Sequence, residues 1–181
     1  PAPFNMRREF TTWIKNEIAN AKIGKPAYIH LKLNNLVDRE IIQLLLDAAE
    51  SGVEVKLNIR GMFSLVTPDS LESNIKAIAI IDRFLEHTRV FFFCNGGEEK
   101  VYFSSADLMT RNMDRRVEVT CPVLDPELQR ELRKMFDIQW KDNRQATILD
   151  ADLQNIPVTN RGKAIRSQME MYKFLSEKSK N

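Results

Sequence analysis

The sequence predicts an α/β fold, in which a mixed β-sheet carries helices on both faces. Residues 28–59 read strand, helix, strand within about 33 residues, which is the pattern of a βαβ unit. Further strand-like stretches follow, and two of them are joined by the turn sequence Asn95-Gly96-Gly97. Amphipathic stretches at both ends of the chain supply the helices that such a sheet needs to cover its two faces.

The first helix is expected over residues 4–22. Apolar side chains recur there at the spacing of one helical face, at Phe10, Trp13, Ile14 and Ile18. The sequence Gly24-Lys25-Pro26 then stops the helix.

The βαβ unit follows. Residues Tyr28–Leu33 alternate, with Ile29, Leu31 and Leu33 on one side and His30, Lys32 and Asn34 on the other. A helix is predicted from the N-cap Asp38 to Glu50, with Ser51-Gly52 as its stop, and Val53–Ile59 alternates again. A connection of this kind between two strands makes them parallel, with a right-handed crossover.

The second half of the chain is predicted to extend the sheet. A polar loop over 61–73 leads to a strand at 75–80, and Asp125-Pro126 opens a helix that runs to Trp140. The other elements expected are strands at 89–94, 101–106, 116–123 and 143–149, and a final helix at 162–178.

Composition narrows the class of protein. The chain has 181 residues, of which 43% are hydrophobic and 29% charged, as in one globular domain. No apolar run reaches the ~20 residues of a membrane span. Cys94 and Cys121 lie inside apolar, strand-like runs, so we expect two buried thiols in a reducing compartment rather than a disulfide or a metal site.

The net charge of +2 is too small to indicate a nucleic-acid partner. The positive excess is local, because residues 161–181 carry six Lys or Arg against two Glu. This basic C-terminal segment could meet phosphate, or it could serve solubility alone.

Candidate functional residues gather where the predicted strands end. Ligand sites in open α/β sheets form at the carboxyl ends of strands, and this edge should collect Asn34, Asn35, Arg60, the stretch after Ile80 and the loop after 101–106. Arg60-Gly61 sets a guanidinium beside a residue without a side chain, so both could approach one anion. His87 lies between Arg83 and Arg89 and can move a proton near neutral pH or act as a nucleophile towards phosphorus.

Hydroxyls and guanidinium groups downstream complete the candidate set, in the segments Ser104-Ser105-Ala106-Asp107 and 111–116. These groups suit an anionic, phosphate-rich ligand. The sequence has no Walker loop, kinase glycine loop, metal-ligand cluster or Gly-x-Ser-x-Gly elbow.

Each candidate also has a structural interpretation. His87 could be a surface or capping residue, Arg60 could close a surface ion pair, and the two serines could satisfy backbone groups at a strand end. Arg115 and Arg116 could lie in a solvated turn, paired with Glu86, Asp107 or Asp114. His30, in the middle of a strand, is expected to be structural, and Phe91-Phe92-Phe93 to be core.

Several of these stretches together resemble the C-terminal domain of bacterial polyphosphate kinase, a family with phospholipase-D-like catalytic halves. They occur in order over nearly the whole chain: Ala2-Pro3-Phe4-Asn5, residues 31–38, Ile59-Arg60-Gly61-Met62, residues 81–87, Asn95-Gly96-Gly97, residues 104–109 and residues 111–118.

The resemblance implies a phospholipase-D-like fold and a role in reversible transfer of the terminal phosphate of ATP to inorganic polyphosphate. In that family the transfer proceeds through a phosphohistidine and requires Mg²⁺. Arg60 matches the arginine that contacts ATP phosphates, and His87 matches the second catalytic histidine, which donates a proton or contacts the nucleotide. The phosphorylated histidine and the arginines associated with Mg²⁺ belong to the preceding catalytic half, so no metal ligand is expected in these 181 residues.

The resemblance also implies an organisation. Residues 1–24 would form a helix leading from a preceding domain, and residues 25–181 the C-terminal domain itself. The implied partners are ATP or ADP, polyphosphate and the preceding catalytic domain of the same polypeptide, in an enzyme that is a homo-oligomer at full length and does not bind nucleic acid. The implied location is the cytoplasm, with membrane association of the full-length enzyme left open.

The sequence departs from the family pattern at Phe63 and Leu108, where cysteine and tryptophan are common, and in the short loop 64–73. Two alternatives to half of a kinase site stay open. One is a non-catalytic module that binds polyphosphate or nucleotide. The other is a phosphodiesterase of the phospholipase D type that pairs His87 from two chains. The absence of a lysine two residues after His87 argues against this second alternative.

Overall fold

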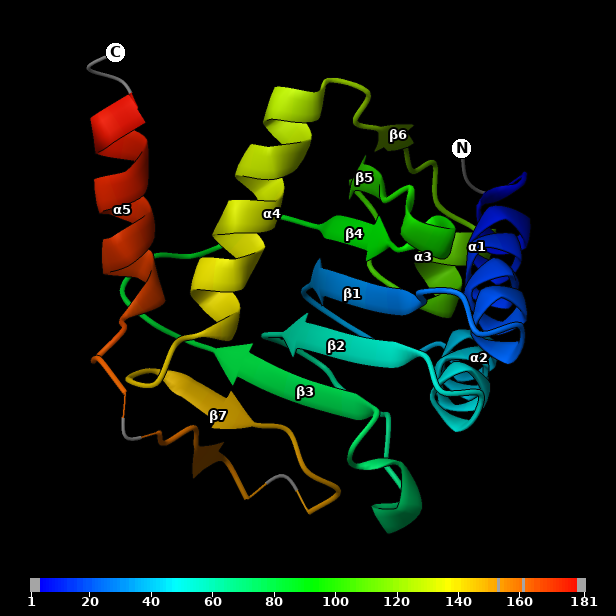
Figure 1. The fold of residues 1–181 in the computed structure, drawn as a ribbon, viewed down its shortest axis with the longest axis horizontal. Coiled ribbons are helices and arrows are strands. Elements are labelled where there is room, and N and C mark those ends of the chain that lie inside the picture. The colour runs from blue at the N-terminus through cyan, green and yellow to red at the C-terminus, as the bar shows by residue number, and fades with distance from the viewer. Residues whose placement is uncertain (1–3, 153, 161, 179–181) are drawn as a thin grey trace.

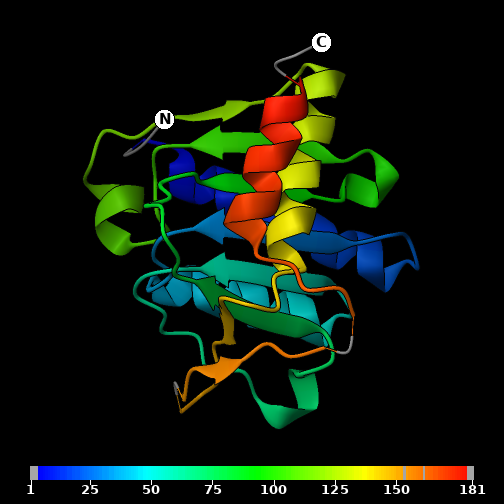
Figure 2. The same cartoon turned by 90° about the vertical axis from the view of Figure 1, so that its left-hand side faces the viewer.

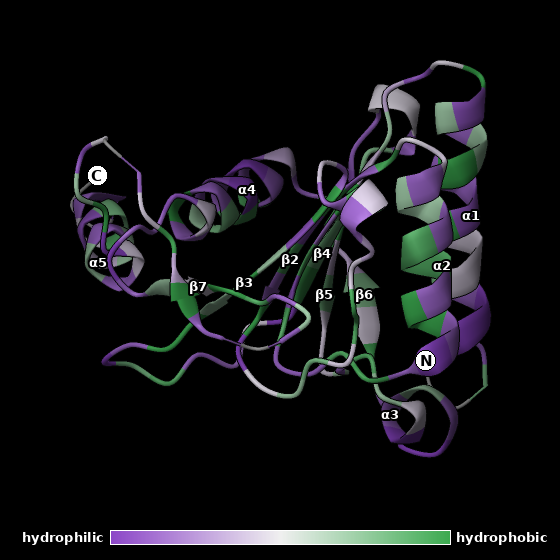
Figure 3. Cartoon of the chain, turned by 90° about the horizontal axis from the view of Figure 1, so that it is seen from below, coloured by the Kyte–Doolittle hydropathy of each residue, from purple (hydrophilic) through white to green (hydrophobic). Residues whose placement is uncertain are grey.

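The computed structural model describes residues 4–152, 154–160 and 162–178. Its described strands form one sheet in the order β6-β5-β4-β1-β2-β3-β7-β8. Helices α1 (Met6–Lys22) and α2 (Arg39–Glu50) cover one face, and α4 (Pro126–Trp140) covers the other with α5 (Ser167–Lys178) beside it (Figures 1 and 3). The predicted α/β fold, with helices on both faces of a mixed sheet, is confirmed.

Strand directions bring several loops to one edge of the sheet. The central strands β1 (Tyr28–Leu33), β2 (Glu54–Ile59) and β3 (Ile75–Ile80) are parallel. The others pair antiparallel with their neighbours: β4 (Val90–Phe93), β5 (Lys100–Ser104), β6 (Thr120–Pro122), β7 (Ala146–Ile148) and β8 (Ile156–Pro157). The carboxyl ends of β1, β2, β3 and β5 therefore face the same way, which is to the left in Figure 1.

Local sequence signals explain the βαβ unit. The Asp38 side chain accepts a hydrogen bond from the Ile41 amide at 3.2 Å and caps α2, as predicted. Strands β1 and β2 then pair in register from Tyr28 opposite Glu54 to Leu33 opposite Ile59.

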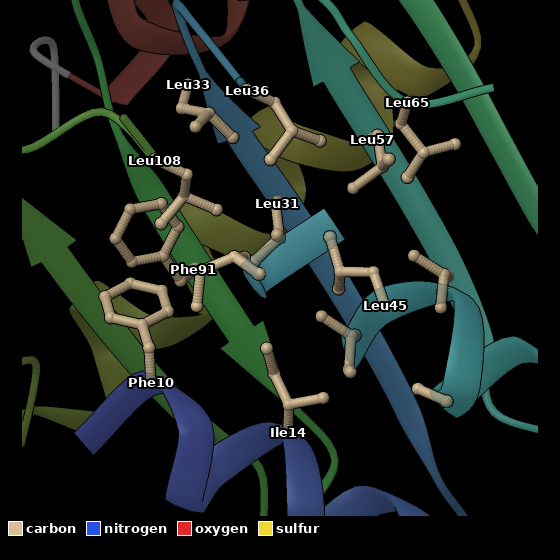
Figure 4. Packing of buried hydrophobic residues seen from close by; sticks show 14 of the residues in the cluster. Phe10, Ile14, Leu31, Leu33, Leu36, Leu45, Leu57, Leu65, Phe91 and Leu108 are labelled. Carbon is tan, nitrogen blue, oxygen red and sulfur yellow. The ribbon is translucent and has the colours of Figure 1, made fainter. Parts of the chain in front are cut away.

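The larger core lies between the sheet and helices α1 and α2 (Figure 4). Phe10 and Ile14 of α1 are buried there with Leu31 and Leu57 of the central strands. The Phe10 ring meets Phe91 edge to face at 5.0 Å. Because α1 contributes to this core, its amphipathic stripe is fully explained by packing.

The opposite face of β1 is also buried, although it carries polar side chains. His30 and Lys32 are 7% and 6% exposed. The reason is α4, whose Phe136 packs against Phe92 of β4 at a ring distance of 5.4 Å. As expected, all three phenylalanines at 91–93 are buried.

Several predicted boundaries were wrong. The strand expected at 116–123 covers only 120–122, and a short helix, α3 (Thr110–Asp114), precedes it. Residues 162–166 are not helical, because the Asn143 side chain binds the Lys163 carbonyl and the Ile165 amide. The strand expected at 143–149 covers only 146–148, since the Asp142 carboxylate caps the amides of Arg144 and Gln145 in a turn.

The two cysteines differ. Cys94 is buried as predicted, but Cys121 is exposed because β6 is an edge strand whose outer face is uncovered. Both thiols are free. Among the described residues, no helix combines the length and the apolar character needed to cross a membrane.

Candidate functional site

The predicted edge exists, and hydrogen bonds connect its parts. Asn34 follows β1, Arg60 follows β2, His87 lies in the loop 81–89 after β3, and Asp107 follows β5. Figure 2 looks onto this edge of the sheet. The parallel strands deliver these residues from positions far apart in sequence to one place, as the strand order requires.

Arg60 is held from one side and open on the other. Its Nε donates to Asn34 Oδ1 at 2.7 Å, and its Nη2 lies 3.4 Å from His87 Nδ1. Its Nη1 has no hydrogen-bond partner among the residues that the structure describes. The guanidinium is half-buried. A fork fixed at Nε by a neutral amide keeps donors available for an anion.

The contact with Arg60 defines how His87 can act. Arginine only donates hydrogen bonds, so His87 Nδ1 accepts and the ring proton of the neutral imidazole lies on Nε2. The His87 side chain is exposed, and its carbonyl accepts a hydrogen bond from Arg89 at 3.1 Å. No residue in the described part of the chain forms a hydrogen bond with its Nε2.

Gly61 lets two loops meet closely. Its amide donates to the Asn34 carbonyl at 2.8 Å. A Cβ at position 61 would lie 2.6 Å from Asn35 Oδ1 and 2.8 Å from that carbonyl oxygen. Glycine at this position is thus required by the approach of the Asn34-Asn35 turn.

Asp107 organises the same turn from β5. Its carboxylate accepts from the amides of Asn34 and Asn35, from the Asn35 side chain and from Arg89. Burial by itself would raise the pKa of Asp107, but the bonds from Arg89, Asn35 and the Asn34 amide outweigh it and lower that pKa. The carboxylate stays charged and locks Arg89 in a structural role.

The two serines predicted as candidates have structural partners. The Ser104 hydroxyl accepts from the Ala106 amide at 3.0 Å, and Ser105 binds Glu118, so both serines satisfy groups at a strand end. Among the described residues, no contact joins Arg111, Arg115 or Arg116 to Arg60 or His87.

The acidic partners expected for Arg115 and Arg116 were wrong. Glu86 pairs with Lys32, Asp107 with Arg89, and Asp114 with Arg7. Arg116 instead lies 4.0 Å from Glu118. The pairs of Glu86, Asp107 and Asp114 join residues from 18 to 107 positions apart in the chain, so sequence neighbourhood was a poor guide to them.

His30 is structural, as expected. Its Nε2 lies 2.8 Å from Glu54 and its Nδ1 2.7 Å from Arg133. Burial, together with the positive charges of Arg133 and Lys56, lowers the pKa of His30 to about 4 against the opposing effect of Glu54. The sequence did not indicate Arg133, which reaches His30 from α4.

The residues of this edge do not form a Mg²⁺ site by themselves. In the described part of the chain, no group of three or more His, Cys, Asp or Glu side chains is placed to hold a metal ion. The carboxylates of Asp82, Glu86 and Asp107 at this edge are paired with Arg166, Lys32 and Arg89.

Comparison with solved structures defines the fold class. A phospholipase D family member, Nuc from Salmonella typhimurium, matches with a TM-score of 0.52 and 14% identity over 75% of this chain and 89% of that one. NucT from Helicobacter pylori matches with a TM-score of 0.55 and 12% identity. The fold is that of phospholipase-D-like α/β domains.

Stronger matches identify the family. The family described as polyphosphate kinase C-terminal domain 2 matches residues 1–168. The crystal structure of polyphosphate kinase from Porphyromonas gingivalis matches with a TM-score of 0.95 and 42% identity, over 99% of this chain and 28% of that one. The chain belongs to the polyphosphate kinase C-terminal domain family.

Curated relatives agree. The chain is 46% identical to polyphosphate kinase of Escherichia coli K12 over 177 residues, and 43% identical to that of Vibrio cholerae over 182 residues. The two matches cover 96% and 99% of this chain. The chain spans only about a quarter of the length of each relative.

Proposed function

We propose that this domain supplies one half of the active site of an ATP:polyphosphate phosphotransferase. Besides membership of the family, the observation that carries the proposal is the Arg60–His87 pair. Arg60 Nη2 lies 3.4 Å from His87 Nδ1, at the edge of the sheet where the parallel strands end. Phosphoryl transfer depends mainly on positioning and on neutralising charge, which arginine forks provide.

Arg60 is proposed to bind the phosphates of ATP or ADP and of polyphosphate. Asn34 holds Nε, so Nη1 and Nη2 remain for phosphate oxygens. A charge-assisted hydrogen bond of this kind contributes about 1.5–3 kcal/mol.

His87 is proposed to act beside Arg60 as a proton donor or nucleotide contact. With Nδ1 turned to Arg60, the N–H at Nε2 can donate to a phosphate oxygen of the transferring group or of the leaving nucleotide. His30 is unsuited to this role, because both of its ring nitrogens are engaged under α4.

The rest of the site is proposed to come from a preceding catalytic half of the same polypeptide. That half would contribute the phosphorylated histidine and the groups around Mg²⁺, residues 1–24 would lead from it, and residues 25–181 would form this domain. Curated relatives in the family are about four times longer than this chain, which leaves room for such a half. This organisation explains why the chain itself has only one exposed histidine, His87, in its described part. We place the enzyme, as a homo-oligomer, in the cytoplasm, where ATP and free thiols coexist.

A homodimeric phosphodiesterase is not favoured. The residue two positions after His87 is Arg89, and Asp107 holds it at 2.9 Å, so it does not replace the lysine of phospholipase D enzymes. A module that only binds polyphosphate would make the same Arg60 contacts, but it would have no use for His87.

The test is ATP formation from ADP, polyphosphate and Mg²⁺. It compares the complete polypeptide with this chain alone, and adds His87→Ala and Arg60→Ala. We expect activity only in the complete polypeptide, a large loss of turnover in His87→Ala and an increased KM for ADP in Arg60→Ala. Arg130→Ala, at an exposed arginine on α4, is the matched control and should be silent.

Two results would contradict the proposal. Robust turnover by this chain alone would remove the need for a second half. Normal turnover in His87→Ala with weakened polyphosphate binding in Arg60→Ala would leave only a binding module.

A further inference from the structure

We propose that Gln168 and Glu86 position His87, by clamping the loop 81–89 to the start of α5. The proposal rests on the proposed function, because it assigns a purpose to contacts around a histidine that acts in phosphate transfer. Neither Gln168 nor Glu86 forms a hydrogen bond or an ion pair with Arg60 in the described part of the chain.

The loop needs such a clamp because it has no apolar anchor. None of the residues from Ile81 to His87 is buried, and the side chains of Ile81 and Leu85 are both 72% exposed. Hydrophobic packing therefore does not set the path of the loop. Polar contacts to the surrounding elements have to do so.

Gln168 makes those contacts from the first turn of α5. Its Oε1 accepts from the Phe84 amide at 2.8 Å, and its Nε2 donates to the Phe84 carbonyl at 2.8 Å. A side-chain amide that pairs with both backbone groups of one residue fixes that residue as a neighbouring strand would. Figure 2 shows α5 standing in front of the sheet edge, and Gln168 itself is only 4% exposed.

Glu86 is the second attachment, one residue before His87. Its Oε2 lies 3.0 Å from Lys32 Nζ and 2.5 Å from Gln139 Nε2, and its Oε1 accepts from Gln168 Nε2 at 2.9 Å. Lys32 is buried on β1 and Gln139 on α4. Burial lowers the pKa of Lys32 while Glu86 opposes that effect, so the pair is held in place by the cost of leaving a buried charge alone.

Arg60 and His87 share part of their support, but Gln168 serves only the loop of His87. Arg60 is set by β2 and by Asn34 at the end of β1. His87 is held through Glu86, which contacts Lys32 of β1, Gln139 of α4 and Gln168 of α5, and through its own carbonyl, which accepts from Arg89. Loosening the clamp should move His87 and leave the phosphate-binding fork where it is. This separation predicts an effect on turnover without an equal effect on nucleotide affinity.

The experiment uses the complete polypeptide with Gln168→Ala and, as a second variant, Gln168→Glu. The glutamate keeps an acceptor for the Phe84 amide but cannot donate to the Phe84 carbonyl or to Glu86. We expect both to lower kcat for ATP formation by about ten- to a hundredfold, the range that a misplaced catalytic group produces, with KM for ADP within about twofold of the parent. Amide hydrogen exchange should accelerate in residues 81–89.

Gln129→Ala is the matched control. Gln129 is a half-buried glutamine on α4 that donates to a backbone carbonyl, that of Val123 at 2.6 Å, far along the helix from the loop. It should leave kcat and exchange in 81–89 unchanged.

The outcomes separate this proposal from the proposed function. Faster exchange in 81–89 with unchanged kcat would overturn the clamp, as would an equal loss of kcat in Gln129→Ala. Unchanged kcat in His87→Ala would instead remove the role of His87 itself, whatever Gln168 does.

Discussion

At the scale of single residues, close approach decides which side chains this edge tolerates. Gly61 has no unusual backbone angle, yet its Cα hydrogens face the Asn34 carbonyl and the Asn35 amide oxygen. Asn35 in turn accepts from the Met62 amide and donates to Asp107. One missing methyl group thus allows the turns after β1 and β2 to share hydrogen bonds directly beside Arg60.

Gly61→Ala should disturb this arrangement. The added Cβ would lie 2.8 Å from a backbone oxygen that cannot rotate away, and overpacking of this kind costs about 1–3 kcal/mol. We expect a lower free energy of unfolding in urea and a loss of ATP formation by the complete polypeptide, because Arg60 is the adjacent residue.

Gly24→Ala is the control for that prediction. Gly24 has a φ of 72°, and no neighbouring atom lies within 4 Å of its ideal Cβ. Alanine there would strain the backbone by about 1–2 kcal/mol without causing a steric clash. It should reduce stability while sparing turnover per folded molecule. Equal effects of the two substitutions on turnover would contradict a local role for Gly61.

At the scale of elements, one carboxylate joins three helices. Asp38 caps α2 through the Ile41 amide, accepts from both terminal nitrogens of Arg7 on α1 at 2.8 and 2.9 Å, and accepts from Thr110 of α3 at 2.9 Å. Burial alone would raise the pKa of Asp38, but these donors lower it. The cap therefore also fixes how α1 and α3 sit against α2.

Asp38→Ala should cost more than an ordinary cap. Losing the cap costs about 1 kcal/mol, and the broken contacts to Arg7 and Thr110 bring the expected loss to about 2–4 kcal/mol. Asp125→Ala, which removes the exposed cap of α4, should cost only about 1 kcal/mol. Urea unfolding of both variants measures the difference, and equal losses would show that the links between helices contribute nothing.

At the scale of the whole molecule, acid stability should depend on His30. The unfolded chain binds this proton near pH 6.5, whereas the folded protein binds it only near pH 4. The unfolded state therefore holds more protons between these values. Stability contributed by neutral His30 is complete above about pH 6.5 and is lost as the pH falls towards 4.

This linkage amounts to about 2 kcal/mol between pH 7 and pH 5. Urea unfolding at the two pH values should show that loss in the parent chain and a clearly smaller one in His30→Gln. The pKa values of Asp38 and Asp107 are lowered, so these carboxylates lose their contribution to the free energy of unfolding only below the interval from pH 7 to pH 5. The same slope in parent and His30→Gln would mean that folded His30 is charged.

How far the sequence predicts this protein depends on the range of the interactions involved. The βαβ unit, the turn at Asn95-Gly96-Gly97 and the cap at Asp38 were predicted because their signals lie within a few residues of one another. The edge with Arg60 and His87 was predicted because strand direction alone places residues that follow parallel strands together. Helix α3 was missed, since its five residues show too little periodicity to indicate a helix.

By itself, then, the sequence determined the family, the order of the main elements and the edge at which Arg60 and His87 meet. Only the tertiary structure decided which charges pair: Arg7 with Asp114 across 107 residues, and Glu86 with Lys32. It brought Gln168 to Glu86 as a hydrogen-bond donor. It also decided that the polar face of β1 is buried and that His30 stays neutral. These outcomes depend on packing, which removes certain groups from water and brings them within hydrogen-bond distance of one another. The local spacing of residues in the sequence does not encode that proximity.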